Sequence, residues 1–99
     1  MRDQVRRVLI AEDLPDAARP LVRAFKKKPA WEIAVVNDGD IALDFLLRRG
    51  GYTDVWRPDL FILNINMPRV DGLEVLEQAM LVSRGSRVDY PSKWRRERE

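Results

Sequence analysis

Three polar side chains follow or end apolar stretches of this 99-residue chain, and all three could take part in ion or phosphate chemistry. Glu12 and Asp13 follow the apolar run 8–11, and Asn64 ends the apolar run that begins at Leu60. Adjacent carboxylates suit a hard divalent cation such as Mg²⁺, which prefers oxygen ligands and keeps several waters. The simpler alternative is that the acidic pair only marks the polar end of a strand.

The chain contains neither cysteine nor histidine, which narrows the possible chemistry. Without cysteine there is no disulfide framework and no thiolate metal site. Without histidine the commonest general base and metal ligand is absent. Any site must therefore be built from carboxylates, amides, hydroxyls, Lys or Arg.

The pattern of apolar residues predicts alternating strands and helices. A continuous apolar run is typical of a parallel strand covered on both faces, and apolar residues three or four apart indicate a helix. Such an alternation implies a parallel sheet with right-handed crossovers. The predicted strands are 8–11, 31–36 and 60–65, and the predicted helices lie within 14–28, 40–50 and 72–80.

Two residues bear on the helix boundaries. Pro20 would remove a hydrogen bond from a helix interior at a cost of roughly 3 kcal/mol, so we expect a kink or a delayed, weakened helix within 14–28. Asp40 is the predicted N-cap of the second helix, because its carboxylate could accept a hydrogen bond from a free backbone N–H.

The order of the strands decides whether the polar strand ends meet. In open α/β sheets, ligands bind beyond the carboxyl ends of the strands, at the point where the strand order reverses. If the first strand lies between the second and the third, in the order 2-1-3, then Glu12, Asp13 and Asn64 project into one crevice. We therefore expect the chemistry of the chain at that crevice.

Three segments, "VLIAED-x-P-D", "DG-x-x-AL-x-FL" and "PDLFILNINMPRVDGLEVL", together resemble the receiver domain of bacterial response regulators. The resemblance covers about residues 7–77, and it is strongest to small single-domain regulators partnered with phytochrome-type histidine kinases. It implies a flavodoxin-like (CheY-like) α/β fold. It also implies a non-enzymatic module of two-component phosphorelay signalling.

The resemblance implies a role for four residues of the crevice. Glu12 and Asp13 match the acidic pair that holds Mg²⁺ in the family, and the backbone carbonyl of Asn66 matches a further metal ligand. Asn64 matches the aspartate that accepts the phosphoryl group, and it would also lie at the metal. The family's catalytic position is thus substituted in this chain.

An amide at position 64 changes what the site can do. It has the shape of a carboxylate but no charge, and it is a poor nucleophile, so Asn64 should not form an acyl phosphate. It also removes one anionic ligand, so we expect Mg²⁺ binding to be weak or lost. The chain would then act by binding a partner, either a sensor histidine kinase or another signalling protein.

The C-terminal part of the chain departs from the family. The resemblance implies two further strand–helix units, which supply a hydroxyl and a lysine to the phosphoryl group, but we find no strand after residue 77. Ser83, Ser86 and Lys93 have no strand context. We therefore divide the chain into a partial receiver domain, residues 1–81, and a basic, polar tail, residues 82–99, that is disordered or loosely packed, as truncation or replacement would produce.

Without the two missing strand–helix units, the 60–65 strand becomes an exposed sheet edge, and one face of the sheet lacks a covering helix. Several hundred Å² of exposed apolar surface corresponds to several kcal/mol at about 25 cal/mol per Å², which is comparable with the whole stability of a small domain. We therefore expect homo-oligomers, formed through the exposed 60–65 edge or through a swapped element.

Two alternatives from other functional classes remain open. A Mg²⁺-dependent phosphotransfer enzyme could have a similar fold, but it needs a carboxylate where Asn64 stands. The basic tail with Tyr90 and Trp94 could bind nucleic acid, although a solvated tail is the simpler interpretation. No apolar run approaches the ~20 residues of a membrane helix and no signal peptide is recognisable, so we expect no membrane contact and a cytoplasmic location.

Overall fold

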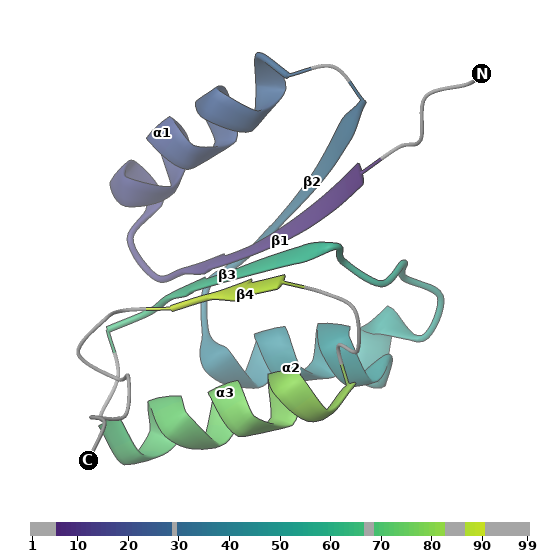
Figure 1. Ribbon diagram of the computed structural model, residues 1–99. Coiled ribbons are helices and arrows are strands. Elements are labelled where there is room, and N and C mark those ends of the chain that lie inside the picture. The colour runs from purple at the N-terminus through teal and green to yellow at the C-terminus, as the bar shows by residue number, and fades with distance from the viewer. Residues whose placement is uncertain (1–5, 29, 67–68, 83–86, 91–99) are drawn as a thin grey trace.

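The computed structural model describes residues 6–28, 30–66, 69–82 and 87–90. Its four strands form one parallel sheet in the order β2-β1-β3-β4, with α1 on one face and α2 and α3 on the other (Figure 1). The predicted α/β class and the 2-1-3 neighbours are therefore confirmed. The elements are β1 (Arg6–Glu12), α1 (Pro15–Lys26), β2 (Trp31–Val36), α2 (Gly39–Leu47), the 3-10 helix η1 (Gly50–Tyr52), β3 (Leu60–Asn64), α3 (Arg69–Val82) and β4 (Arg87–Asp89).

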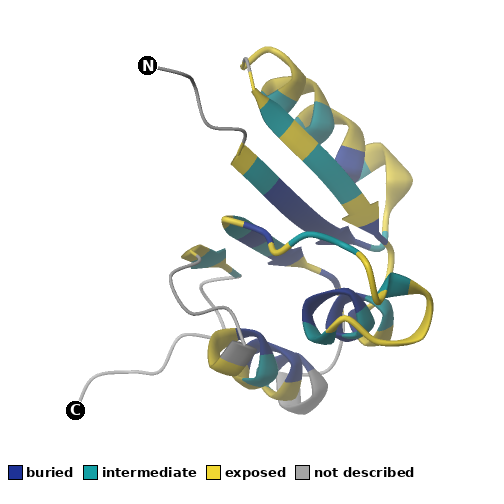
Figure 2. Cartoon of the chain, turned by 90° about the vertical axis from the view of Figure 1, so that its right-hand side faces the viewer, coloured by how far each residue is buried: buried dark blue, intermediate teal, exposed yellow. Residues whose placement is uncertain are grey.

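The strand β1 is the centre of the molecule. Its residues Val8 to Ala11 have no solvent exposure, because β1 pairs with β2 and β3 and is covered on both faces. This explains why the run is apolar at every position. The larger part of the core lies between the sheet and α2 and α3 (Figure 2). Its buried members are Leu9, Ala11, Val36, Ala42, Leu43, Phe45, Leu46, Phe61, Leu63, Ile65, Val75, Leu76 and Ala79.

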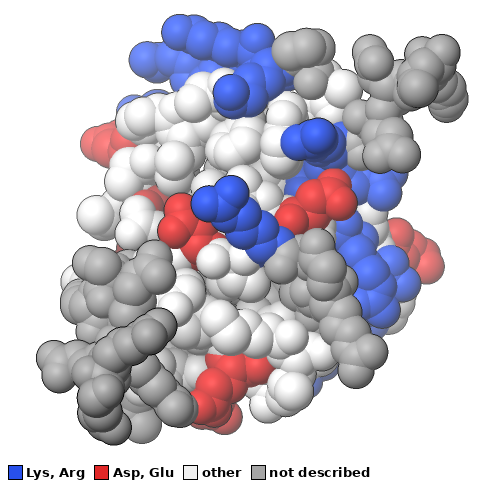
Figure 3. Space-filling view, in the orientation of Figure 1, with Lys and Arg blue, Asp and Glu red and all other residues white. Residues whose placement is uncertain are grey.

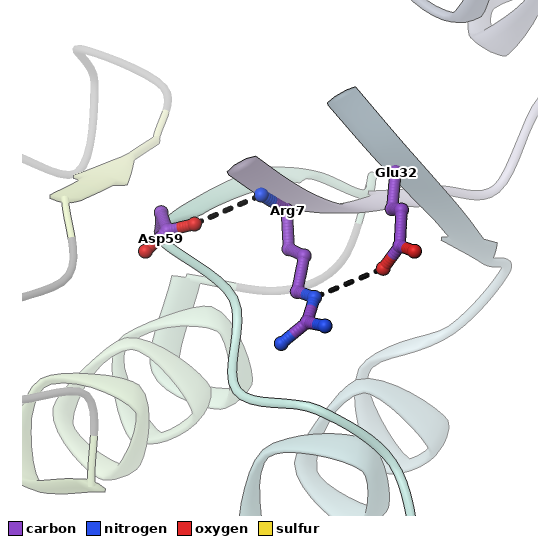
Figure 4. Close-up of polar contacts among 3 residues, drawn as sticks. All are labelled: Arg7, Glu32 and Asp59. Atoms are coloured by element: carbon purple, nitrogen blue, oxygen red, sulfur yellow. Dashed lines mark hydrogen bonds and ion pairs between the residues drawn. The ribbon is translucent and has the colours of Figure 1, made fainter. Parts of the chain in front are cut away.

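Asp59 holds β1 and β3 together at the end where both strands begin. Its Oδ2 accepts a hydrogen bond from the backbone N–H of Arg7 at 2.8 Å, and its own N–H donates to the Arg7 carbonyl at 2.8 Å (Figure 4). The guanidinium of Arg7 pairs in turn with Glu32 on β2, with Nε 2.9 Å from Oε1. These contacts fix a register in which Val8 lies opposite Leu60.

The helix α1 begins at Pro15 and continues through Pro20, so a delayed start is wrong, and the alternative of a kink stays a prediction. Ala18 is the buried residue of α1, and packing of this side of the helix against β1 and β2 helps to offset the one hydrogen bond that Pro20 lacks. The N-cap of α2 is Asp38 and not Asp40. The Oδ1 atom of Asp38 accepts from the N–H of Ile41 at 2.8 Å, and its extended backbone suits a cap.

A fourth strand corrects our interpretation of the tail. The strand β4 pairs in parallel with β3, with Arg87 opposite Leu60 and Asp89 opposite Ile62. The expectation that no strand follows residue 77 is therefore wrong, and β3 is not a sheet edge through which copies could pair. Because β4 lies within residues 82–99, the sheet extends beyond the boundary that we placed after residue 81.

Only part of the predicted tail is described. Ser83, Ser86, Lys93 and Trp94 lie outside the described residues. Tyr90 lies inside them, and it is partly buried against the core, so packing accounts for its ring without base stacking. Within the described ranges, none of the helices combines the length and the apolarity that crossing a membrane requires.

Replacing Val88 with Asp should lower the free energy of unfolding by about 1–3 kcal/mol, because a charge would enter a half-buried position against the core. Arg87→Asp is the matched control, since it introduces the same side chain at an exposed position of β4. It should change the free energy of unfolding by no more than about 0.5 kcal/mol. Urea denaturation followed by circular dichroism measures both variants. Equal losses would contradict the packing of β4 in this register.

Candidate functional site

The carboxyl ends of β1 and β3 place two of the predicted site residues in contact. Glu12 lies opposite Asn64 in the register of the two strands, and the Nδ2 atom of Asn64 donates to Oε1 of Glu12 at 2.5 Å. An ionised carboxylate can only accept hydrogen bonds, so the amide turns its NH₂ group toward it. The amide therefore supplies a donor at the point where a carboxylate would supply a second acceptor.

Glu12 is the one charged side chain that is buried among the described residues, with 4% of its surface exposed. Its other oxygen, Oε2, accepts from the backbone N–H of Leu14 at 3.1 Å. Both carboxylate oxygens thus have an N–H partner. Because burying a charge is costly unless hydrogen bonds replace its water, these two donors are what permit Glu12 to lie at this depth.

Asp13 and Asn66 lie at the solvent side of the same cluster. The backbone N–H of Asn66 points to Oδ1 of Asp13 at 3.4 Å, a distance that makes this hydrogen bond weak. Asp13 is half-buried, and Asn64 and Asn66 are exposed. The structure therefore brings all four predicted residues together, with Glu12 beneath and the other three open to water.

The cluster contains two carboxylates where the family pattern has three. Across the part of the chain that the structure describes, no group of three or more His, Cys, Asp or Glu side chains is arranged to hold a metal ion. The oxygen atoms of Glu12 and Asp13 are of the kind that Mg²⁺ prefers. Three of these four oxygens already face N–H groups, from Asn64, Leu14 and Asn66.

Comparison with known proteins identifies the family. Residues 8–88 match the model of the response regulator receiver domain, and this segment runs from within β1 to within β4 and contains the four-residue cluster. The chain belongs to the response regulator receiver family. Receiver domains act in two-component signalling, so the family and the general role that the sequence resemblance implied are confirmed.

The most informative relatives of this receiver are phytochrome response regulators. Rcp1 of Synechocystis sp. is 33% identical over 72 residues, which is 72% of this chain and 49% of Rcp1. The bacteriophytochrome response regulator AtBRR is 32% identical, with a TM-score of 0.72 over 89% of this chain and 66% of that one. The Mn²⁺-bound form of Rcp1 has a TM-score of 0.72 at 30% identity, over 88% of this chain and 66% of that one.

A third relative is the phosphorylated cyanobacterial phytochrome response regulator RcpA, which is 29% identical with a TM-score of 0.73, over 89% of this chain and 66% of that one. The chain thus spans about half the length of the curated relative Rcp1 (49%) and 66% of the solved RcpA chain. The similarity to phytochrome regulators was predicted from the sequence and is confirmed.

The sequence analysis missed Asp59, which positions the site from the opposite end of the strands. Its two hydrogen bonds to Arg7 set the register that ends with Glu12 beside Asn64. The only signal in the sequence is an Asp directly before an apolar strand, and that pattern alone does not distinguish a clamp from an ordinary loop residue.

The variant Asn64→Asp should be less stable than the natural chain by about 1–3 kcal/mol in Mg²⁺-free buffer, because Glu12 would lose a donor and gain a neighbouring like charge. Added Mg²⁺ should raise the stability of this variant more than that of the natural chain. Urea denaturation with and without Mg²⁺ measures both effects.

The matched control is Asn37→Asp, which makes the same change at an exposed residue after β2. Its stability should follow that of the natural chain, with or without Mg²⁺. An Asn64→Asp variant that behaves like this control would show that Asn64 and Glu12 do not interact.

Proposed function

We propose that the chain is a receiver module that takes up no phosphoryl group and acts by binding a signalling partner, of which a sensor histidine kinase is the first candidate. One observation carries the proposal. The residue at the phosphoryl-accepting position of the resemblance is an amide, and it donates to the buried carboxylate of Glu12 at 2.5 Å. The attacking group at this position is a carboxylate oxygen, whereas the amide oxygen of Asn64 carries no negative charge and is a poor nucleophile.

The family implies Mg²⁺ at this cluster, and the residues fit it only in part. When bound, the ion neutralises charge on the transferring phosphoryl group. Glu12, Asp13 and the backbone carbonyl of Asn66 would hold it, and the Mn²⁺-bound form of Rcp1 supports a divalent cation in a receiver of this kind. Asn64 lowers the negative charge of the site by one, and its N–H already satisfies Oε1 of Glu12. We therefore propose that Mg²⁺ binding is weak or lost.

We also propose that the chain catalyses no reaction of its own. A Mg²⁺-dependent phosphotransfer enzyme would need an attacking carboxylate, and the end of β3 supplies an amide. Nucleic-acid binding through the tail gains no support from the described residues, since Tyr90 is packed against the core. Binding without turnover is the function that remains consistent with the geometry of the cluster.

Incubation with a small phosphodonor and Mg²⁺, followed by intact-mass measurement, tests the proposal. The natural chain should gain no phosphoryl group, because an amide does not attack phosphorus under conditions in which a carboxylate does. A base-labile phosphoryl adduct mapped to Asn64 would contradict the proposal directly.

The Asn64→Asp variant separates two causes of inactivity in the same experiment. If this variant is phosphorylated, the amide alone explains why the natural chain takes up no phosphoryl group. If it is not, the lack of the hydroxyl and the lysine that the family places on later strands also prevents phosphorylation. The control Asn37→Asp should gain no phosphoryl group in either case.

A further inference from the structure

An apolar groove runs along one flank of α1, on the sheet face opposite α2 and α3. It encloses about 450 Å³. Its floor is formed by Ala18 and Val22 of α1 and by Val35 of β2, which is 45% exposed although it is apolar. Its wall consists of the cationic side chains Arg19, Arg23 and Lys26. We call this surface the α1 groove.

The cations of the α1 groove are available for an acidic partner. Arg19 pairs with Asp16 at 2.6 Å on the same helix, but both side chains are exposed, so this pair contributes little and is easily exchanged. Arg23 and Lys26 form no ion pair with any residue in the described ranges. The groove therefore combines an uncovered apolar floor with unneutralised positive charge.

A surface of the opposite character lies on the outer side of α3. Glu74, Glu77 and Leu81 follow one another at three- and four-residue spacing, so they lie on one side of the helix, with Met80 beside them. Both Glu residues are exposed, Met80 is 50% exposed and Leu81 is 71% exposed. We call these four residues the α3 ridge.

The groove and the ridge face away from each other across the sheet. In Figure 3, cationic side chains gather at the top of the view, over the end of α1, and acidic side chains lie at the bottom, over α3. One copy therefore cannot bring its own ridge to its own groove. Two copies can, since each presents both surfaces.

We propose that the α1 groove of one copy receives the α3 ridge of a second copy. Met80 and Leu81 would cover the apolar floor, and Glu74 and Glu77 would lie against Arg23 and Lys26. Burial of exposed apolar area drives such a contact, and opposite charges set its orientation and speed.

The contact joins two different surfaces, so it is heterologous, and successive copies form a ring or an open chain instead of a two-fold dimer. This contact replaces the β3 edge as the proposed surface for self-association, because β4 pairs with that edge. It does not depend on the proposed function, because neither surface contains a residue of the four-residue cluster.

Sedimentation velocity of the full chain and two charge-reversed variants tests the contact. The natural chain should associate with rising concentration, and about 0.5 M NaCl should weaken this because it screens the ion pairs. The groove variant Arg23→Glu/Lys26→Glu and the ridge variant Glu74→Lys/Glu77→Lys should each weaken self-association at least tenfold. An equimolar mixture of the two should associate again, since each reversed surface meets its complement.

The control Lys27→Glu/Lys28→Glu makes the same charge change beyond the groove and should associate like the natural chain. Circular dichroism checks that every variant is folded, and the neutral variants Arg23→Gln and Leu81→Gln replace any that is not; each should raise the dissociation constant. A natural chain that is monomeric at all concentrations would overturn the proposal. Association that survives both reversals, or that the mixture does not restore, would overturn it as well.

Discussion

The parallel register of β1 on β3 is the constraint on which the site depends. Asp59 fixes this register at one end through two hydrogen bonds to Arg7, and the other end of the same ladder places Asn64 beside Glu12. A shift by one residue would turn every side chain to the opposite face of the sheet, so the buried apolar faces of both strands oppose it. Whatever residue stands at position 64 is therefore held against a buried carboxylate.

That placement explains why an amide is compatible with the fold. Two carboxylates at this distance repel each other unless a cation lies between them, whereas an amide offers an N–H to the same carboxylate. Asn64 thus supplies internally part of the charge compensation that a bound cation would give. Both oxygens of Glu12 thus have N–H partners within the chain, which is consistent with the proposed function.

The sequence pattern was sufficient for the parts of the fold that depend on long apolar runs. The alternation of strands and helices predicted the parallel sheet, and the convergence of Glu12, Asp13 and Asn64 followed once the order 2-1-3 was assumed. The strand β4 could not be predicted in this way, because it has three residues and only Val88 among them is apolar. Its pairing depends on the free edge of β3, which is a tertiary property. The cap at Asp38 was misplaced by two residues because Asp38 and Asp40 both lie at the start of the same helix, and only the backbone conformation distinguishes them.

The face of the sheet that carries α1 differs from the other face in how well it is covered. The side that packs against α2 and α3 contains most of the buried core, whereas Leu60 and Ile62 on the α1 side remain half-buried and Val35 is exposed. The sequence analysis expected one sheet face to lose a covering helix, and among the described residues α1 is the one helix on this face. Association between copies and recognition of a partner would both draw on this exposed area.

The central claim is that the Asn64 amide is bound to the Glu12 carboxylate in solution and takes the place of a cation there. The NMR signals of the Asn64 side-chain NH₂ group report this contact most directly. They should shift when Glu12 is replaced by Gln, and they should stay unchanged when Mg²⁺ is titrated to roughly millimolar concentration, within the usual range of weak divalent sites. The account would be contradicted if the chemical shifts of this NH₂ group stayed the same in the Glu12→Gln variant. It would also be contradicted if they changed with Mg²⁺ until the site was saturated.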